Sequence, residues 1–265
     1  MYKGFCIDKD TIHLVVNPYK TSVSHTQRFK DVLVRLNAKE SNIAPRIATL
    51  LKGDAKGVID GEALQNACMP TNSNYDIFIS HSHTEEKEAK DLAAYLADSY
   101  GLKCFVDSFV WGSCDNEILR PLDDIWSTHE TKKGSYSYEK RNYSTSLVHA
   151  MLSMALLEMI DKCECCFFIK PTSDLIVSSI GDCIASPWIY EEITIFNKIQ
   201  KRIPFGKKRR CTESDALPRV RYKLDLSDMP LLNAVHLQKN ISMDDGITDY
   251  TKANRWLDDL YDNVK

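Results

Sequence analysis

The stretch YDIFISHSHTEEKEAKDLAAYLADSYGLKCFVD, residues 75–107, decides the fold class of this chain. Its first six residues, YDIFIS, form a short apolar run typical of a buried strand. Ser82 and Glu85 have the spacing of a helix-capping box, and apolar residues then recur at helical spacing up to Gly101. The segment KCFV follows as a second short strand, which Asp107 ends. Strand, helix and strand in this order indicate a parallel α/β sheet.

The same alternation continues downstream. Residues 146–161 are predicted to form a buried helix, and residues 163–169 (CECCFFI) a third strand. Ser186 followed by Pro187 is a strong signal for the start of another helix, because Ser favours the N-cap and Pro the first helical position. The last predicted elements are two strands, Val220–Leu226 and Ala234–Leu237, and a terminal helix, Asp249–Val264.

Two regions stand outside this pattern. Residues 1–72 are predicted to form a small, mainly helical N-terminal region, because apolar residues recur at helical spacing within residues 29–36 and 43–51. Residues 108–145 are too long for an ordinary loop between strand and helix, and their aromatic residues predict an ordered, packed insertion. We therefore expect two parts: the N-terminal region, and a domain over residues 73–265 that contains the insertion.

Composition and charge limit the classes of protein that the chain can belong to. With 43% hydrophobic and 27% charged residues, the composition is that of a globular protein, and a net charge of −3 argues against an obligate nucleic-acid binder or a membrane-surface protein. The first ten residues lack the pattern of a secretory signal, and the longest apolar run, Leu147–Leu157, is too short to span a bilayer. We expect a cytoplasmic protein.

The cysteines and the basic residues favour structural over functional interpretations. Nine cysteines, an odd number, occur without zinc-binding spacing, and we expect Cys163, Cys165 and Cys166 to be reduced thiols in a strand core rather than metal ligands. No structural metal is expected. The basic stretch Lys198–Arg210 is predicted to be a solvated helix end and loop rather than a nucleic-acid patch.

Three segments, in order, resemble the TIR (Toll/interleukin-1 receptor) family. Residues 75–82 (YDIFISHS) resemble the family's first strand and the loop after it, and residues 101–107 (GLKCFVD) resemble its second strand. Residues 186–193 (SPWIYEEI) resemble its signature helix, in which a Trp is followed four residues later by a Glu. The resemblance implies a flavodoxin-like fold for residues 75–265: five parallel strands with helices on both faces.

The resemblance also implies an activity. Many bacterial and plant TIR domains cleave the nicotinamide–ribose bond of NAD with a Glu of the signature helix, and the matching position here is Glu192. Loss of nicotinamide leaves positive charge on the ribose, which a fixed carboxylate stabilises without a metal or cofactor. Trp188 and Glu192, at positions i and i+4, project from one helix face, whereas Glu191 lies on another and is interpreted as a helix-start acid.

Candidate substrate contacts lie where the strands end. In open α/β sheets, ligands bind at the carboxyl ends of the strands. The loop after the first strand offers Ser80, His81 and Ser82, although Ser82 is equally suited to cap the helix and the histidine to lie in a solvated loop. Asp107 ends the neighbouring strand, and Trp188 accompanies Glu192 on the signature helix.

The insertion and the helix after it supply further candidates. Trp111, Arg141 and Asn142 are predicted to close over the dinucleotide, with Arg141 meeting the pyrophosphate or, alternatively, pinning the loop through ion pairs. His149 is either a residue of the same crevice or a core histidine, and we favour the core.

Two functions from different classes are compatible with these features. The first is an NAD glycohydrolase or cyclase whose ADP-ribose-derived product serves as a signal in immune defence, such as anti-phage defence, and is received by a separate effector protein. The second is a non-catalytic TIR scaffold that signals through contacts with other TIR domains. Glu192 favours the first. Because catalytic TIR domains commonly become active on association, the resemblance also implies self-association.

Overall fold

The computed structural model describes residues 1–22, 25–37, 43–55, 57–112, 115–129, 134–171, 186–202, 229–238 and 249–264. The chain divides into two compact units. Unit 1 comprises residues 1–35, 74–106 and 160–265, and unit 2 comprises residues 36–73 and 107–159. These borders differ from the predicted border near residue 72, because the first 35 residues belong to the unit that contains the sheet.

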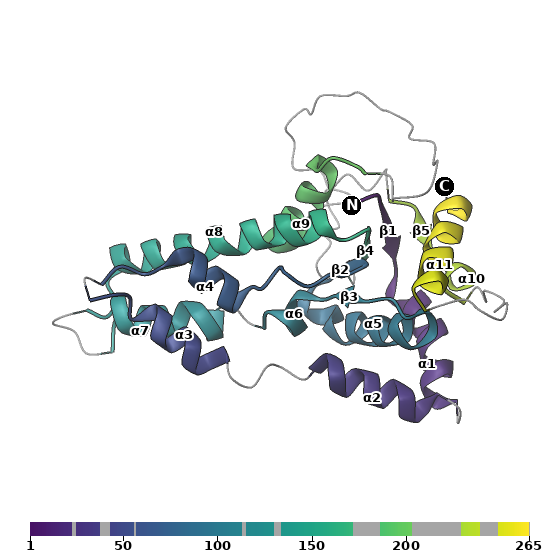
Figure 1. Ribbon diagram of the computed structural model, residues 1–265, viewed down its shortest axis with the longest axis horizontal. Helices are drawn as coiled ribbons and strands as arrows, with labels where there is room; N and C mark the ends of the chain where they lie inside the picture. The colour runs from purple at the N-terminus through teal and green to yellow at the C-terminus, as the bar shows by residue number, and fades with distance from the viewer. Residues whose placement is uncertain are drawn as a thin grey trace, which may run out of the picture. The chain divides into compact units, whose positions relative to one another are not determined.

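Unit 1 is built on a five-stranded, all-parallel sheet with the strand order β3-β2-β4-β1-β5 (Figure 1). The strands are β1 (Lys3–Ile7), β2 (Ile77–Ser80), β3 (Cys104–Phe105), β4 (Cys165–Ile169) and β5 (Leu231–Leu232). Each residue of β2, β3 and β4 is buried, as expected for parallel strands that helices cover on both faces. The predicted flavodoxin-like α/β fold is confirmed.

The N-terminal strand β1 occupies an inner position of the sheet. If the strands are counted along the chain from β2, the neighbours β3, β2 and β4 are the second, first and third strands, which is the order of the flavodoxin pattern. The strand β1 lies next to β4, in the position that the fourth strand has in that pattern. Phe5 is in register with Phe167 on β4, and Ile7 with Leu232 on β5. The prediction of a helical N-terminal region is therefore wrong for Lys3–Ile7. It is confirmed for the helices that follow, α1 (Lys9–Thr21), α2 (Thr26–Asn37), α3 (Ile43–Leu51) and α4 (Gly61–Cys68).

The remaining strand predictions have different outcomes. The first three, at β2, β3 and β4, are confirmed. Val220–Leu226 lies outside the described residues. Ala234–Leu237 was predicted to be a strand and is the helix α10 (Ala234–Gln238), because the Asn233 side chain caps it by accepting from the backbone N–H of His236 at 3.1 Å. The adjoining strand, β5, is instead Leu231–Leu232.

Helices cover both faces of the sheet. The helix α11 (Asp249–Asn263) packs on one face: Tyr261 stacks on Phe5 with ring centroids 5.9 Å apart, and Trp256 lies 6.4 Å from Phe167. The helix α5 (Glu86–Tyr100), which ends at Gly101 in the left-handed conformation, packs against α11 through a stacked pair of Tyr100 and Trp256. The helix α9 (Pro187–Lys198) packs against β1, where Phe196 covers Gly4.

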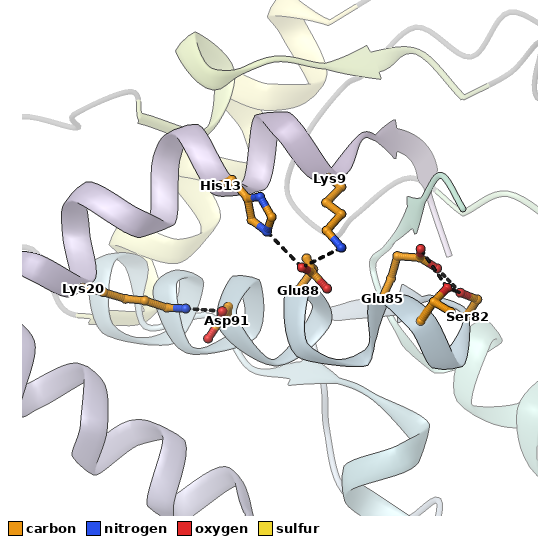
Figure 2. Close-up of polar contacts among 8 residues, drawn as sticks. Lys9, His13, Lys20, Ser82, Glu85, Glu88 and Asp91 are labelled. Carbon is orange, nitrogen blue, oxygen red and sulfur yellow. Dashed lines mark hydrogen bonds and ion pairs between the residues drawn. The ribbon is translucent and has the colours of Figure 1, made fainter. Parts of the chain in front are cut away.

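Figure 2 shows the charged contacts that join α1 to α5. Lys9 Nζ and His13 Nε2 both approach Glu88 Oε1, at 3.2 and 2.9 Å, and Lys20 pairs with Asp91. Burial alone would raise the pKa of Glu88, but the hydrogen bonds from His13 and Lys9 outweigh it and hold that pKa below its ordinary value. The N-terminal helix is therefore tied to the sheet unit by ion pairs as well as by the strand that precedes it.

Unit 2 is helical. Besides α3 and α4 it contains α6 (Asp107–Val110), a π-helical turn (Asp115–Leu119), α7 (Arg120–Trp126) and most of α8 (Tyr138–Lys162). The Trp126 indole donates to the carbonyl of Leu51 at 2.6 Å, and the Trp111 indole donates to that of Pro70 at 3.2 Å. Trp111 is buried, whereas Trp126, Tyr136, Tyr138 and Tyr143 are exposed, so the prediction of a packed insertion is confirmed for only part of its described residues.

The helix α8 begins eight residues earlier than predicted, at Tyr138 instead of residue 146. One side of it is buried, and the other is exposed. Among the described helices, α8 alone is long and apolar enough to cross a membrane, a criterion that the core helix of a soluble protein also meets.

Candidate functional site

The start of α9 follows directly from its sequence. Ser186 is the N-cap and accepts from the backbone N–H of Ile189 at 3.5 Å, and Pro187 occupies the first helical position. The helix buries four residues at positions i, i+3, i+4 and i+7, which are Ile189, Glu192, Ile193 and Phe196. Glu192 is thus a carboxylate within an otherwise apolar, core-facing stripe, where burial is costly unless the group is bound.

A hydroxyl at the end of β2 binds this carboxylate. Ser80 Oγ donates to Glu192 Oε2 at 2.5 Å, although the two residues are 112 positions apart. Ser80 is 1% exposed and Glu192 6% exposed. Because β2 is parallel to its neighbours, Ser80 lies at the carboxyl edge of the sheet, where ligands of this fold class bind. Two residues that the sequence nominated independently are therefore in direct contact.

The negative charge of Glu192 also raises the pKa of a thiol on β4. Burial raises the pKa of the Cys166 thiol well above its ordinary value, and the nearby Glu192 carboxylate adds to this shift. Burial likewise raises the pKa of Cys163 to about 12 and that of Cys165 well above the ordinary range. These residues are buried free thiols, as predicted, and their thiols stay protonated at neutral pH.

The loop after β2 contains a second buried acid. Ser82, buried and preceding a 3₁₀ turn (His83–Glu85), donates a hydrogen bond from its hydroxyl to the carboxylate of Glu85, as Figure 2 shows. Glu85 is completely buried, and Thr84 Oγ1 also donates to it at 2.9 Å. His81 is half-buried, with Nδ1 3.5 Å from the Ile79 carbonyl, whereas His83 is exposed.

Glu85 was not nominated as a site residue by the sequence. Its spacing from Ser82 predicted a capping box, in which each side chain bonds a backbone N–H. The two side chains instead bond each other, and Ser82 makes no side-chain capping bond. The complete burial of Glu85 could not be read from spacing alone.

The other two residues of interest on α9 differ in exposure. Trp188 lies in the first turn and is 38% exposed, four residues before Glu192. Glu191 is half-buried and lies outside the buried stripe. Trp188 and Glu192 are thus one helical turn apart, the first exposed and the second buried.

Five predicted site residues belong to unit 2. Asp107 opens α6, and its Oδ1 accepts from the backbone N–H of Ser108 at 2.7 Å. Trp111 is 4% exposed and is held by its bond to Pro70. The site described here is confined to unit 1, and a part for these unit 2 residues in substrate binding stays a prediction.

Arg141, Asn142 and His149 are all exposed on α8. Arg141 Nε pairs with the buried carboxylate of Asp123 at 3.2 Å, and its guanidinium lies 5.2 Å from the ring centre of Tyr136. The geometry thus favours the alternative in which Arg141 holds its region in place through an ion pair. The core position favoured for His149 is wrong, because the residue lies on the exposed side of the helix.

Within the part of the chain that the structure describes, no group of three or more His, Cys, Asp or Glu residues is arranged to hold a metal ion. Comparison of the chain with protein-family models, curated proteins and solved structures found no match. The chemistry of the site must therefore be argued from the residues themselves.

Proposed function

We propose that this chain is a TIR-type enzyme that cleaves the nicotinamide–ribose bond of NAD, with Glu192 as its catalytic residue. The observation that carries the proposal is a buried carboxylate in the core-facing stripe of α9, bound by Ser80 at the carboxyl edge of a parallel sheet. Ionisable groups held in this way are concentrated at functional sites. The family resemblance of residues 75–107 and 186–193 selects the same carboxylate.

The reaction needs only what such a site offers. The bond between the anomeric carbon and the nicotinamide nitrogen breaks, and its electron pair leaves with the nitrogen, so that nicotinamide departs as a neutral molecule. The ribose then carries positive charge, which the Glu192 carboxylate stabilises. Water attacks the anomeric carbon and releases a proton to give ADP-ribose, or a nucleophile within the same molecule closes a cyclic product.

Ser80 is proposed to orient the catalytic carboxylate. Its hydroxyl donates to Oε2 of Glu192 and so fixes the orientation of the carboxylate. A hydrogen bond to a charged group contributes about 1.5–3 kcal/mol, and loss of this much transition-state stabilisation corresponds to roughly tenfold to hundredfold in rate. Cysteine chemistry does not enter this mechanism, since the neighbouring thiols are protonated.

The proposal is tested with purified full-length chain and NAD. Nicotinamide release and the masses of the products are measured for the parent and for Glu192→Gln, which keeps the side-chain volume and removes the charge. We expect Glu192→Gln to abolish release and Ser80→Ala to lower it within the range above. Glu191→Gln is the matched control, because it makes the same change at the adjacent, half-buried position. Cleavage by Glu192→Gln at the parental rate would contradict the assignment.

The wider setting of the proposal is a cytoplasmic enzyme of immune defence, whose product a separate effector protein receives. A second candidate, the non-catalytic scaffold, is favoured by one observation: several apolar side chains of α8 are exposed, among them Tyr143 and Met154. A parent that releases no nicotinamide but associates with itself would favour the scaffold.

A further inference from the structure

Lys170 is the first residue after β4, at the edge of the sheet where Ser80 ends β2. Its backbone N–H donates to the carbonyl of Ile7 at 2.8 Å, which continues the ladder between β4 and β1 by one residue. The chain is therefore still extended at this position. In an extended strand, side chains two positions apart point to the same face of the sheet, so Lys170 shares a face with Phe168 and Cys166.

This face is the one that carries the site. Phe168 is in register with Ser80 on the neighbouring strand, and the Ser80 hydroxyl binds Glu192. The Glu192 carboxylate also acts on the pKa of Cys166, which places that thiol on the same face. Neighbouring strands lie about 4.8 Å apart, and two residues advance a strand by about 6.6 Å, so the Cα atoms of Ser80 and Lys170 are separated by roughly 8 Å.

A separate observation places the Lys170 ammonium on this face. Its positive charge opposes the rise that burial causes in the pKa of the Cys6 thiol. Cys6 follows Gly4 by two positions on β1, and Gly4 is covered by Phe196 of α9. Cys6 therefore belongs to the face that α9 covers, and so does the ammonium that acts on it.

The Lys170 ammonium has no anion of its own. Within the described part of the chain, it forms no hydrogen bond or ion pair, although the residue is half-buried. Other cations are already bound: Lys9, which follows β1 at the same edge, pairs with Glu88, and Arg141 pairs with Asp123. A partly desolvated cation without a partner is suited to bind an anionic ligand.

We propose that Lys170 binds the diphosphate of the dinucleotide whose ribose meets Glu192. This inference rests on the proposed function, because the position of the ribose comes from it. The diphosphate carries two negative charges, which the Glu192 carboxylate would repel, and Lys170 offsets that repulsion from the same face and edge of the sheet. Its compact ammonium is a common ligand of phosphate. The phosphate on the 5′ oxygen of the nicotinamide ribose is the charged group closest to the bond that breaks.

A contact with the diphosphate is made before and during bond cleavage alike. Its loss therefore weakens binding of substrate and transition state equally, which raises KM and leaves kcat unchanged. The bond is a charged one, so Lys170→Met should raise KM for NAD roughly tenfold to hundredfold. Lys170→Arg, which keeps the charge, should recover most of this loss. A variant that merely perturbs the fold would lower kcat as well.

Steady-state kinetics of the full-length chain with two substrates test the inference. Nicotinamide riboside has the same scissile bond as NAD but no phosphate, so Lys170→Met should impair its cleavage far less than that of NAD. Lys103→Met is the matched control, because it removes the same charge from an exposed lysine that precedes β3, at the opposite edge of the sheet. Calorimetric titration with ADP-ribose, which keeps the diphosphate and lacks nicotinamide, measures binding without catalysis. Lys170→Met should raise its dissociation constant by the same factor.

The possible failures can be told apart. If the parent cleaves NAD and Lys170→Met has the parental KM, the inference is overturned and the proposed function stands. Equal losses with NAD and nicotinamide riboside would also overturn it, since Lys170 would then support the fold. If the parent does not cleave NAD, the proposed function fails, and the titration decides: weaker ADP-ribose binding in Lys170→Met supports a diphosphate site, whereas unchanged binding, or none in the parent, overturns it.

Discussion

Gly4→Ala, which adds one methyl group to β1, should weaken the packing of α9 against the sheet. A Cβ at position 4 would stand 2.5 Å from Cζ and 2.9 Å from Cε2 of Phe196, whereas carbon atoms in contact normally lie about 3.5–4.0 Å apart. Phe196 is 1% exposed, so its ring cannot turn outward. The methyl group of Met229 would also be touched, at 2.9 Å, but it ends a flexible side chain and can move.

Overpacking of this kind costs about 1–3 kcal/mol, and the severity of the overlap places Gly4→Ala near 2 kcal/mol. Urea unfolding followed by tryptophan fluorescence measures this cost. Phe196→Leu removes the clashing ring carbons, and in the double variant Gly4→Ala should cost far less, which gives a coupling energy of at least about 1 kcal/mol. Gly61→Ala is the control, because a Cβ there meets nothing within 4 Å.

The same variants report on the site. Phe196 lies one helical turn after Glu192 on α9, so displacement of its ring moves the carboxylate relative to Ser80. Nicotinamide release should fall in Gly4→Ala and recover in the double variant with Phe196→Leu. A cost below about 0.5 kcal/mol for Gly4→Ala, or strictly additive costs in the double variant, would refute the reasoning.

Three further predictions concern charge and assembly. The folded-state pKa of Glu88 is below its ordinary value of 4.5. Its bonds to Lys9 and His13 therefore stabilise the fold above pH 4.5, and this stabilisation is lost as the pH falls through the lowered pKa. Glu88→Gln should reduce the difference between the urea midpoints at neutral and acidic pH. Arg141→Met removes the cationic partner of the buried Asp123 carboxylate, which keeps its hydrogen bond from Ser144. Because Arg141 is half exposed, we expect a loss of about 1 kcal/mol in urea unfolding, which Asp123→Asn in the same chain should reduce. If association activates the enzyme, nicotinamide release per chain should rise with protein concentration, and a constant value from a strict monomer would exclude this.

Much of the sheet could be predicted because its strands are continuous buried runs. YDIFIS and CECCFFI contain few polar residues, and strands buried on both faces have this composition. The start of α9 was equally clear, since Ser186 and Pro187 act through local backbone chemistry. Glu192 was nominated because residues 186–193 resemble the TIR signature helix, and its contact with Ser80 lies at the edge of the sheet to which Ser80 was assigned.

What could not be predicted depends on contacts between remote residues. The segment KGFCI has only five residues, and its position between β4 and β5 is decided by partners more than 150 positions away. Gly4 has no local signal either, because its role is set by the ring of Phe196. The apolar run Ala234–Leu237 has four residues, too few to distinguish a strand from a helix by periodicity. The hydrogen bond that the Asn233 side chain accepts from the backbone N–H of His236 stabilises the helix.

The burial of individual polar residues also escaped prediction. His149 was expected in the core, but an apolar sequence around a helical residue does not reveal which side faces solvent. The helix α8 has apolar residues on two sides, so its periodicity alone does not identify the buried face. Glu85 shows the converse, since an acid near a helix start is usually solvated and this one is completely buried.

Incubation of the full-length chain with NAD at high protein concentration, with nicotinamide and products identified by mass, tests the central claim most directly. We predict nicotinamide release together with ADP-ribose or a cyclic isomer, and loss of both in Glu192→Gln. Intact NAD after incubation at high protein concentration, or release that survives Glu192→Gln, would contradict the assignment of this buried carboxylate as the catalytic group.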